Sequence, residues 1–398
     1  MDFLSDSGFQ SSSTDPPAAN EDHDMNENPD HNARVEHKLD VFPDAVPEPV
    51  SVSNHRTLET FFQPEIKNPY LVVHGEQVPR LVVPINTFCT QETKWNWTDL
   101  TMVSKNNQII EEYGYFNEED DFNLLVSRVH YIVSNNAIQV DMNYIDAPIV
   151  ATQELLSELM RTPLDKDTWE IYAWKVNGII YLKRRRGPDG KQVHPRSGSQ
   201  YEAINAKINF KRLMTQSISE RYLPVNESER HIKLSSVSLN GVHGVHNVVT
   251  MSEIEAMDSE GNDVVMHLEP SKDKSLKYKD DFYGKHCLDI WSKSIFTGTN
   301  KWIVCFKTTG TPIRVDDVQV MNTDSEYFRM KMMADTGRTH WDPRAHTSFI
   351  FRFMTFLKDI MQDTRTREGR VVTFKFSSKR CSRELMPSFQ EFYFNNLP

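Results

Sequence analysis

Two pairs of polar residues have the types and the spacing to do chemistry. Glu253 and Glu255 are two residues apart, as are His267 and Glu269 in the next apolar run, and a polar turn over 258–263 separates the pairs. Because side chains two apart on a strand point to the same face, each pair shares one side, and a hairpin would bring the pairs together. Carboxylates crowded in this way raise one another's pKa unless a cation lies between them, so the pattern predicts a metal or proton-transfer site. The alternative is a solvated outer face of an antiparallel sheet.

The length and composition indicate a globular protein of the nucleus or the cytoplasm. The chain has 398 residues, enough for one large domain or two ordinary ones. No apolar run approaches the length of a membrane span, and the first residues lack the pattern of a secretory signal, so we expect no membrane contact. The cysteines are far apart, which favours reduced, buried thiols over a zinc module or a disulfide scaffold: Cys89, Cys287, Cys305 and Cys381.

Nearly all of the net charge lies in the N-terminal segment. Residues 1–50 hold twelve Asp and Glu against two Lys and Arg, whereas the whole chain has a formal charge of −11. The segment is also poor in aromatic residues, so it cannot bury enough apolar surface to offset its ordering entropy. We therefore expect residues 1–52 to be a disordered acidic tail, with a solubilising role, and residues 53–398 to form the folded domain.

Periodicity in the body predicts interleaved helices and strands without strict βαβ alternation. Helices are expected over 121–133, 152–160, 201–217, 280–294 and 343–362. Strands are expected over 70–73, 81–83, 169–174, 178–182, 231–239, 247–256, 263–269, 301–306, 313–320 and 371–376, with Asn177-Gly178 as a hairpin turn. This order favours a single large α+β domain, in which two mixed or antiparallel sheets pack together and are flanked by helices.

Several local strings, in the same order, resemble the decapping exoribonuclease (DXO) family of RNA 5′-end nucleases. The resemblance runs from about residue 55 to the end of the chain, and no single string is decisive. The strings that carry it are Glu158–Pro163, Trp169-Glu170, Gly178–Leu182, Ser292–Gly298 leading into Ile303-Val304 and Phe306, and Trp341–Pro343 before the Phe-rich helix.

The resemblance implies hydrolysis at RNA 5′ ends. Members of the family remove incomplete or NAD-type caps and degrade RNA from 5′ to 3′ with a divalent metal, Mg²⁺ or Mn²⁺. Their site uses an Arg, a Glu on a helix, a Glu-x-Asp strand, a Glu-x-Lys strand and a Gln on a later helix. The carboxylates hold ions that activate water, while Lys and Arg stabilise charge on phosphorus. The resemblance thus predicts RNA 5′ ends as the partner, and no DNA is expected.

This chain departs from that pattern at four of six positions. Glu253 matches the strand Glu, and Glu255 replaces the Asp. The Arg falls on Gln153, the helix Glu on Lys211, and the later Gln on Lys293, while the Glu-x-Lys pair becomes His267-x-Glu269. The resemblance implies Glu253 and Glu255 as catalytic residues. The candidate metal ligands are Glu253, Glu255, His267, Leu268 and Glu269; the candidate RNA-binding residues are Gln153, Lys183, Arg184, Arg185, Arg186, Lys211 and Lys293.

These substitutions leave open whether the protein is an active enzyme. One lost transition-state donor costs about 10²- to 10³-fold in rate, and a unit charge at 4 Å is worth roughly 4 kcal/mol at an effective dielectric near 20. One hypothesis is a metal-dependent decapping nuclease with weakened or abolished turnover, in which Glu269 and His267 help to hold one ion. The alternative is an inactive relative that binds RNA 5′ ends or a protein partner in RNA decay. A third is an unrelated α+β binding protein.

A basic loop gives a second functional signal. The run 183–186 could contact phosphates, and Trp174, Tyr181 and Tyr201 could stack on bases. The alternatives for the loop are a solvated surface or a nuclear-import signal. We interpret His243 and His246 as turn residues, because no Cys or carboxylate lies at metal-ligand spacing from them. The pair Trp95 and Trp97 and the aromatic stripe Phe349–Phe356 are predicted to belong to the core.

Overall fold

The structure is a computed structural model. It describes residues 39–40, 49–63, 100, 118–134, 148–164, 169–185, 206–207, 209–211, 213–215, 230–270, 282, 286–308, 312–325, 328, 341–362, 369–377 and 380–385. All of these belong to one compact unit, residues 35–398. Among them, no helix has the length and apolar character needed to cross a membrane.

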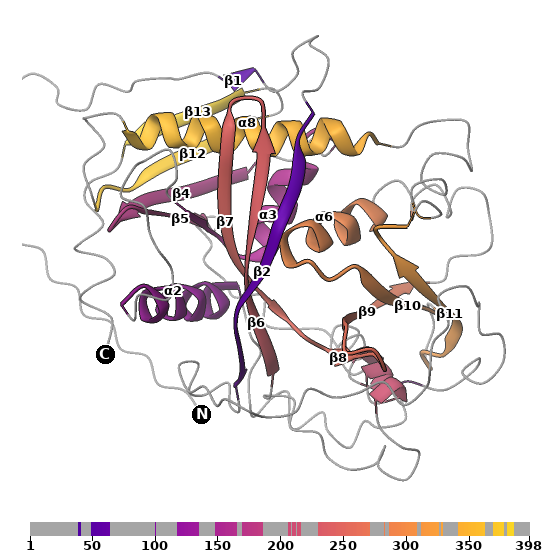
Figure 1. Ribbon diagram of the computed structural model, residues 1–398. Coiled ribbons are helices and arrows are strands. Elements are labelled where there is room, and N and C mark those ends of the chain that lie inside the picture. Colours follow the sequence, from indigo (N-terminus) through magenta and orange to yellow (C-terminus); the bar gives the residue numbers. More distant parts are fainter. Residues whose placement is uncertain are drawn as a thin grey trace, which may run out of the picture. The chain divides into compact units, whose positions relative to one another are not determined.

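A nine-stranded mixed sheet forms the larger of two sheets (Figure 1). Its strand order is β1-β13-β12-β4-β5-β3-β7-β6-β2. The strands are β1 (Leu39–Asp40), β2 (Ser51–Gln63), β3 (Ile149–Val150), β4 (Trp169–Val176), β5 (Ile179–Arg184), β6 (Arg230–Gly241), β7 (Gly244–Glu253), β12 (Val372–Ser377) and β13 (Arg380–Leu385). The short β3 runs parallel to both of its neighbours, β5 and β7, and the other pairs are antiparallel.

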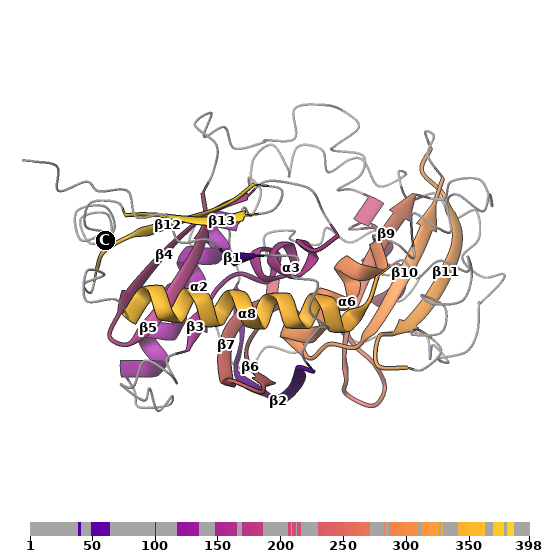
Figure 2. The ribbon, with the colours of Figure 1, turned by 90° about the horizontal axis from the view of Figure 1, so that it is seen from above.

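The second sheet has four strands in the order β11-β10-β9-β8. They are β8 (Ala256–Met257), β9 (Asp263–Pro270), β10 (Lys301–Lys307) and β11 (Val315–Asn322). β9 and β10 are parallel, whereas β8 and β11 pair antiparallel with their neighbours. Figure 2 shows β9, β10 and β11 side by side, with α6 next to them.

Four helices have both ends within the described residues: α2 (Glu118–Ser134), α3 (Gln153–Arg161), α6 (Cys287–Thr297) and α8 (Pro343–Gln362). α3 begins after Thr152, whose hydroxyl accepts a hydrogen bond from the Leu155 N–H, as an N-cap does. α6 ends at Gly298, which adopts the left-handed conformation that favours glycine at a helix C-terminus. α3 packs against both α6 and α8, and α8 also contacts β6 and β7.

Both faces of the large sheet are buried, which explains the continuous apolar run of β5. On β4, Ile171 and Ala173 belong to the main core with α3, α6 and α8, whereas Trp174 packs with α2 on the opposite face. Strand residues that alternate between two buried faces are mostly apolar. A third cluster joins the four-stranded sheet to helical residues near Phe210 and Leu213.

Most of the predicted elements are confirmed. α8 has the predicted bounds, and α2, α3, β4, β5, β10 and β11 lie within a few residues of theirs. The turn between β4 and β5 has positive φ at both Asn177 (52°) and Gly178 (76°), the conformation of a type I′ turn. The aromatic stripe is core, because Phe349, Phe351 and Phe353 are buried.

The structure differs from the predictions in several places. The expected strand 247–256 is two strands, β7 and β8, which lie in different sheets, and β13 follows the strand expected to be last. β1 and β2 begin within the range expected to be disordered, because β13 and β6 supply their backbone partners. Lying outside the described residues are the strands expected at 70–73 and 81–83, the pair Trp95 and Trp97, and Tyr201.

The prediction that Trp174 and Tyr181 stack on bases is wrong. Both side chains are buried, and their rings stack on each other at 5.7 Å between centroids. Their place on strands with two covered faces leaves no surface for a base. The cysteines that the structure describes fully, Cys287 and Cys305, are free and buried as expected.

Candidate functional site

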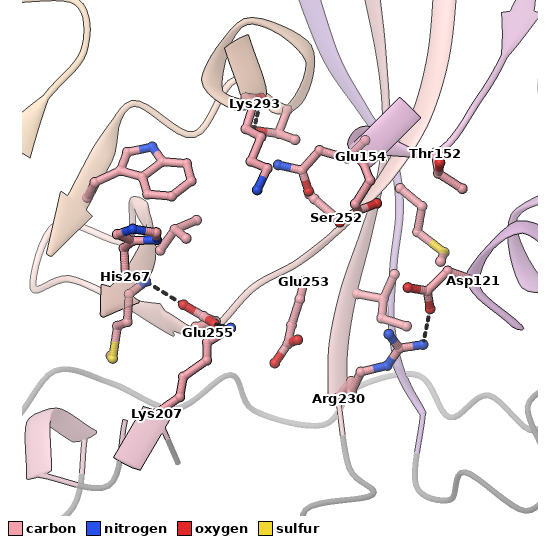
Figure 3. A pocket seen from close by; sticks show the side chains of 17 residues that line it. Asp121, Thr152, Glu154, Lys207, Arg230, Ser252, Glu253, Glu255, His267 and Lys293 are labelled. Carbon is pink, nitrogen blue, oxygen red and sulfur yellow. Dashed lines mark hydrogen bonds and ion pairs between the residues drawn. The ribbon is translucent and has the colours of Figure 1, made fainter. Parts of the chain in front are cut away.

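A cavity of about 180 Å³ lies where the chain passes from the large sheet to the small one (Figure 3). Its walls come from α2, α3 and α6, the β6–β7 pair, β9, β10 and a helical segment around residue 207. The lining residues are Asp121, Thr152, Gln153, Glu154, Lys207, Arg230, Ile232, Met251, Ser252, Glu253, Glu255, Val265, Met266, His267, Lys293, Thr297 and Trp302.

The crossing between the sheets brings both acidic residues to the cavity. Glu253 is the last residue of β7, and Glu255 directly precedes β8. The backbone N–H of Ile254 donates to the His231 carbonyl at 2.8 Å, which fixes the segment between them. β8 then forms the predicted hairpin with β9. The two carboxylates thus line one wall, although they do not lie on one regular strand.

Each carboxylate is paired with a lysine of one helical segment. Lys211 Nζ lies 3.0 Å from Glu253 Oε1, and Lys207 Nζ lies 2.9 Å from Glu255 Oε1. Residues four apart share one face of a helix, so a single segment presents both ammonium groups. Glu255 is only 3% exposed, and its other oxygen accepts a hydrogen bond from the Met266 backbone N–H. Two ammonium groups therefore balance the charge of the two carboxylates.

The surroundings of Glu253 strongly favour its ionised form. Burial raises the pKa of this carboxyl, but the positive charges of Lys211, Lys207 and Arg230 outweigh burial and bring the pKa to about 2. Opposite charges nearby stabilise a carboxylate in this way. Glu253 therefore carries a full negative charge at neutral pH.

Two further cations line the cavity together with the N-terminus of α3. Arg230 pairs with Asp121 of α2 at 2.7 Å, and Lys293 pairs with Asp289 at 2.9 Å along α6. Gln153 is the first residue of α3. The backbone N–H groups at a helix N-terminus attract anions, so this end of α3 adds to the positive side of the cavity.

A second group of ionisable side chains surrounds Glu269. Its carboxylate is 3% exposed, and one oxygen lies 3.1 Å from both His267 Nε2 and His286 Nδ1. Burial raises the pKa of Glu269, whereas the hydrogen bonds and charges of the two imidazoles lower it to about 2. Among the described residues, these three form a group whose possible ligand atoms all lie within 4.8 Å of one another.

The cavity gathers part of the predicted site. Gln153, Glu253, Glu255, His267 and Lys293 line it, and Lys211 is paired with Glu253. Their assigned roles stay predictions.

Other predicted residues lie elsewhere. The Leu268 side chain packs against the apolar cluster of the small sheet. Lys183, Arg184 and Arg185 are not among the cavity's lining residues. Arg184 and Arg185 pair with Glu158 and Glu170 at 3.1 and 2.7 Å. Arg186 is outside the described residues.

Sequence reasoning missed five ionisable residues of this region: Asp121, Glu154, Lys207, Arg230 and His286. All five lie outside 253–269, so no local spacing connects them to the carboxylates. One feature of the sequence could have identified Lys207 as a site residue. It lies four residues before Lys211 in a segment predicted to be helical, and that spacing places both on one face.

Comparisons with known proteins give the family. Residues 99–391 match the family model described as RAI1-like PD-(D/E)XK nuclease, so the chain belongs to that family. A comparison with curated proteins found no significant match.

The fold is similar to several solved structures. Rai1 from Candida albicans, in complex with pU5 and Mn²⁺, is 13% identical, with a TM-score of 0.66 over 91% of this chain and 96% of that one. Schizosaccharomyces pombe Rai1 with 3′-FADP is 12% identical, with a TM-score of 0.60 over 88% and 100%. Kluyveromyces lactis Dxo1 with manganese is 10% identical, with a TM-score of 0.57 over 90% and 97%. At such identities the similarity shows the fold alone.

The surroundings of Glu253 and Glu255 do not fit the divalent metal that the resemblance implied. Both carboxylates already bind lysine ammonium groups, and Glu255 also accepts a backbone N–H. An ion here would have to lie close to Lys207 and Lys211 and be repelled by them. The arrangement is instead suited to receive an anion among cations that are held in place by carboxylates.

Proposed function

We propose that this protein acts on RNA 5′ ends by binding their terminal phosphates in the cavity, and that it hydrolyses them far more slowly than is usual in its family. The observation that carries this proposal is the pairing of Glu253 with Lys211 and of Glu255 with Lys207. The resemblance implies that carboxylates at these positions hold divalent ions, whereas here they are paired with ammonium groups. The site therefore keeps cations that are each held by a carboxylate, while Glu253 and Glu255 lose the role of holding an ion that activates water.

Phosphate binding is supported by the cations around the cavity, to which a phosphate would bind in place of their carboxylate partners. Lys207, Arg230 and Lys293 line it, and the N-terminus of α3 faces it. Hydrogen bonds from charged donors to an oxyanion are worth about 1.5–3 kcal/mol each, so two such contacts give useful affinity. A terminal phosphate is the most highly charged part of an RNA 5′ end. The complex of Candida albicans Rai1 with pU5 supports RNA as the ligand class.

Slow hydrolysis is supported by the residues that replace the family's catalytic groups. The resemblance implies that Glu269 takes the position of the lysine that would stabilise charge on phosphorus; Glu269 is buried between two histidines. Losing one such donor reduces the rate by about 10²- to 10³-fold. Glu269 also has the wrong sign of charge for this role.

A second candidate function is slow metal-dependent decapping. The observation that favours it is that Glu253, Glu255 and His267 all line the same cavity. Once Lys207 and Lys211 are displaced from the two carboxylates, these groups and the imidazole are suitable ligands for Mn²⁺. In this case NAD-type or incomplete caps would be the substrates, as the family resemblance implied.

One experiment separates the two candidates. Purified protein is incubated in excess over 5′-monophosphate RNA and over NAD-capped RNA, in Mg²⁺ or Mn²⁺, beside Glu253→Gln/Glu255→Gln. We expect complex formation without appreciable product. Product that appears with the wild type and disappears in the double variant would establish the second candidate. Failure to bind either RNA would remove both.

A further inference from the structure

Glu269 is an acidic residue whose carboxylate is buried and contacts two histidines. It is buried, and both histidine contacts reach the same oxygen at 3.1 Å. His267 and Glu269 are two apart on β9, so they share one face of the strand, and His286 directly precedes α6. Two different elements therefore direct three ligating groups to one point.

We propose that His267, Glu269 and His286 bind one divalent transition-metal ion, Zn²⁺ by preference, at a site separate from Glu253 and Glu255. This inference goes beyond the proposed function, because phosphate binding by the cavity cations does not require the ion. Neither Glu253 nor Glu255 belongs to the group of three.

The spacing of the ligand atoms suits a tetrahedral ion. Zinc binds His nitrogen and carboxylate oxygen at about 2.0–2.2 Å, so neighbouring ligand atoms around a tetrahedral ion are about 3.3 Å apart. The Glu269 oxygen lies 3.1 Å from each histidine nitrogen, and the whole set lies within 4.8 Å. Small side-chain adjustments would centre an ion between the three atoms.

The donor types and the burial favour a transition metal. Two imidazoles and one carboxylate suit Zn²⁺ better than Mg²⁺, which prefers an all-oxygen octahedron. A buried carboxylate needs a positive partner, and an ion supplies that charge while leaving both histidines neutral. The alternative is a carboxylate that accepts hydrogen bonds from two histidines with no ion present, which the experiment below tests.

The ion would lie at the wall of the cavity. His267 lines the cavity, and its ring meets that of Trp302 edge to face at 6.5 Å between centroids. Three protein ligands leave the fourth position of a tetrahedral ion open. That position would take water or an oxygen of a bound ligand.

The test is the binding of Zn²⁺ to the full-length protein after treatment with a chelator. We expect one equivalent to bind in calorimetry, and we expect Co²⁺ to give the visible absorption of a tetrahedral site with nitrogen and oxygen ligands. His286→Ala removes a ligand whose side chain is 46% exposed, so the fold should survive. The variant should weaken Zn²⁺ binding about 100-fold or more.

Two controls make the result decisive. His243→Ala removes an exposed histidine of the β6–β7 turn, and Glu253→Gln changes the other acidic site; neither should alter Zn²⁺ binding. Zn²⁺ should also raise the Tm of the wild type but not that of His286→Ala. The proposal is overturned if the wild type binds no Zn²⁺, if His286→Ala binds it as well as the wild type, or if Glu253→Gln abolishes binding.

Discussion

At the residue scale, the decisive feature of this chain is the pairing of two cavity carboxylates with lysine side chains. The resemblance implies a carboxylate at the position of Lys211, and Lys207 lies one helical turn before it. Each ammonium group lies within 3.0 Å of a carboxylate oxygen. An ammonium group neutralises a carboxylate, but it cannot bind a water molecule and lower its pKa as a divalent metal ion does. The pairing of these lysines with the carboxylates is therefore the basis of both parts of the proposed function, the binding of terminal phosphates and the slow hydrolysis.

Lys293→Gln tests the contribution of a single cavity cation. The change introduces the amide that the resemblance implies at this position and removes one positive charge from the wall of the cavity. We expect weaker RNA binding and a slope of log affinity against log salt that falls by about 1, because one fewer phosphate contact is made. Fluorescence anisotropy across a salt series measures both.

The matched control is Arg344→Gln, which removes an exposed cation at the start of α8, away from the lining residues of the cavity. It should leave the salt slope unchanged. Equal effects of the two variants would mean that the cavity is not where RNA phosphates bind.

Glu253→Gln should strengthen RNA binding. The substitution removes a negative charge beside Lys211 and releases that ammonium group to contact phosphate. A gain of about 10-fold corresponds to 1.4 kcal/mol, well within the value of one charged contact. The control is Glu260→Gln, in the exposed turn between β8 and β9. Weaker binding by Glu253→Gln would argue that the carboxylate holds a metal through which RNA binds.

At the element scale, the sequence predicted the helices and turns that depend on interactions between residues close together in the chain. The helix α8 follows from apolar spacing after Trp341–Pro343, and the β4–β5 turn follows from Asn177-Gly178. The division of 247–256 into β7 and β8 was missed, because an alternating apolar pattern does not show where a strand leaves one sheet for another. That division, rather than the period of one strand, brings Glu253 and Glu255 to the cavity.

The packing of α8 against the β6–β7 hairpin gives a prediction about stability. A Cβ added at Gly241 would lie 2.6 Å from Phe351 Cζ, a ring buried in the main core. Gly241→Ala should therefore lower the free energy of unfolding by about 1–3 kcal/mol. Val242→Ala, at a neighbouring side chain that is 71% exposed, is the control and should change it by less than about 0.5 kcal/mol. Urea denaturation measures both, and equal stabilities would contradict the packing described.

At the scale of the whole molecule, the sequence predicted the fold class but not the sheet order. The parallel pairing of β3 between β5 and β7, and the separation of strands into two sheets, depend on contacts between distant segments. The same reason explains the missed site residues. Arg230 and His286 reach the site only through tertiary packing, which no spacing along the chain reveals.

The buried His246 predicts how global stability depends on pH. Its Nε2 lies 2.9 Å from Thr355 Oγ1, and its ring packs on Phe351 at 4.5 Å between centroids. Burial, with a smaller contribution from the charge of Lys358, lowers its pKa from 6.5 to about 3. The unfolded chain therefore binds more protons between these values, so stability is full above pH 6.5 and falls as the pH decreases.

We expect protonation of His246 to lower the free energy of unfolding by up to about 1.4 kcal/mol for each pH unit below pH 6.5. Urea unfolding between pH 7 and pH 5 measures the histidines with little contribution from carboxylates, and the difference between the wild type and His246→Gln separates His246 from the others, such as His130, whose pKa burial also lowers. His246→Gln should flatten the profile, whereas His243→Gln, at an exposed position, should not. A profile that His246→Gln leaves unchanged would show that this histidine does not stay neutral in the folded state.

The most direct test of the proposed function compares two RNAs that differ only at the 5′ end. Anisotropy titrations with a 5′-monophosphate RNA and its 5′-hydroxyl counterpart, in EDTA, report whether the cavity recognises the terminal phosphate without a metal. We predict that the 5′-monophosphate RNA binds about 10-fold or more tightly, and that Lys293→Gln reduces this ratio. Equal affinities for the two RNAs would contradict the proposed function.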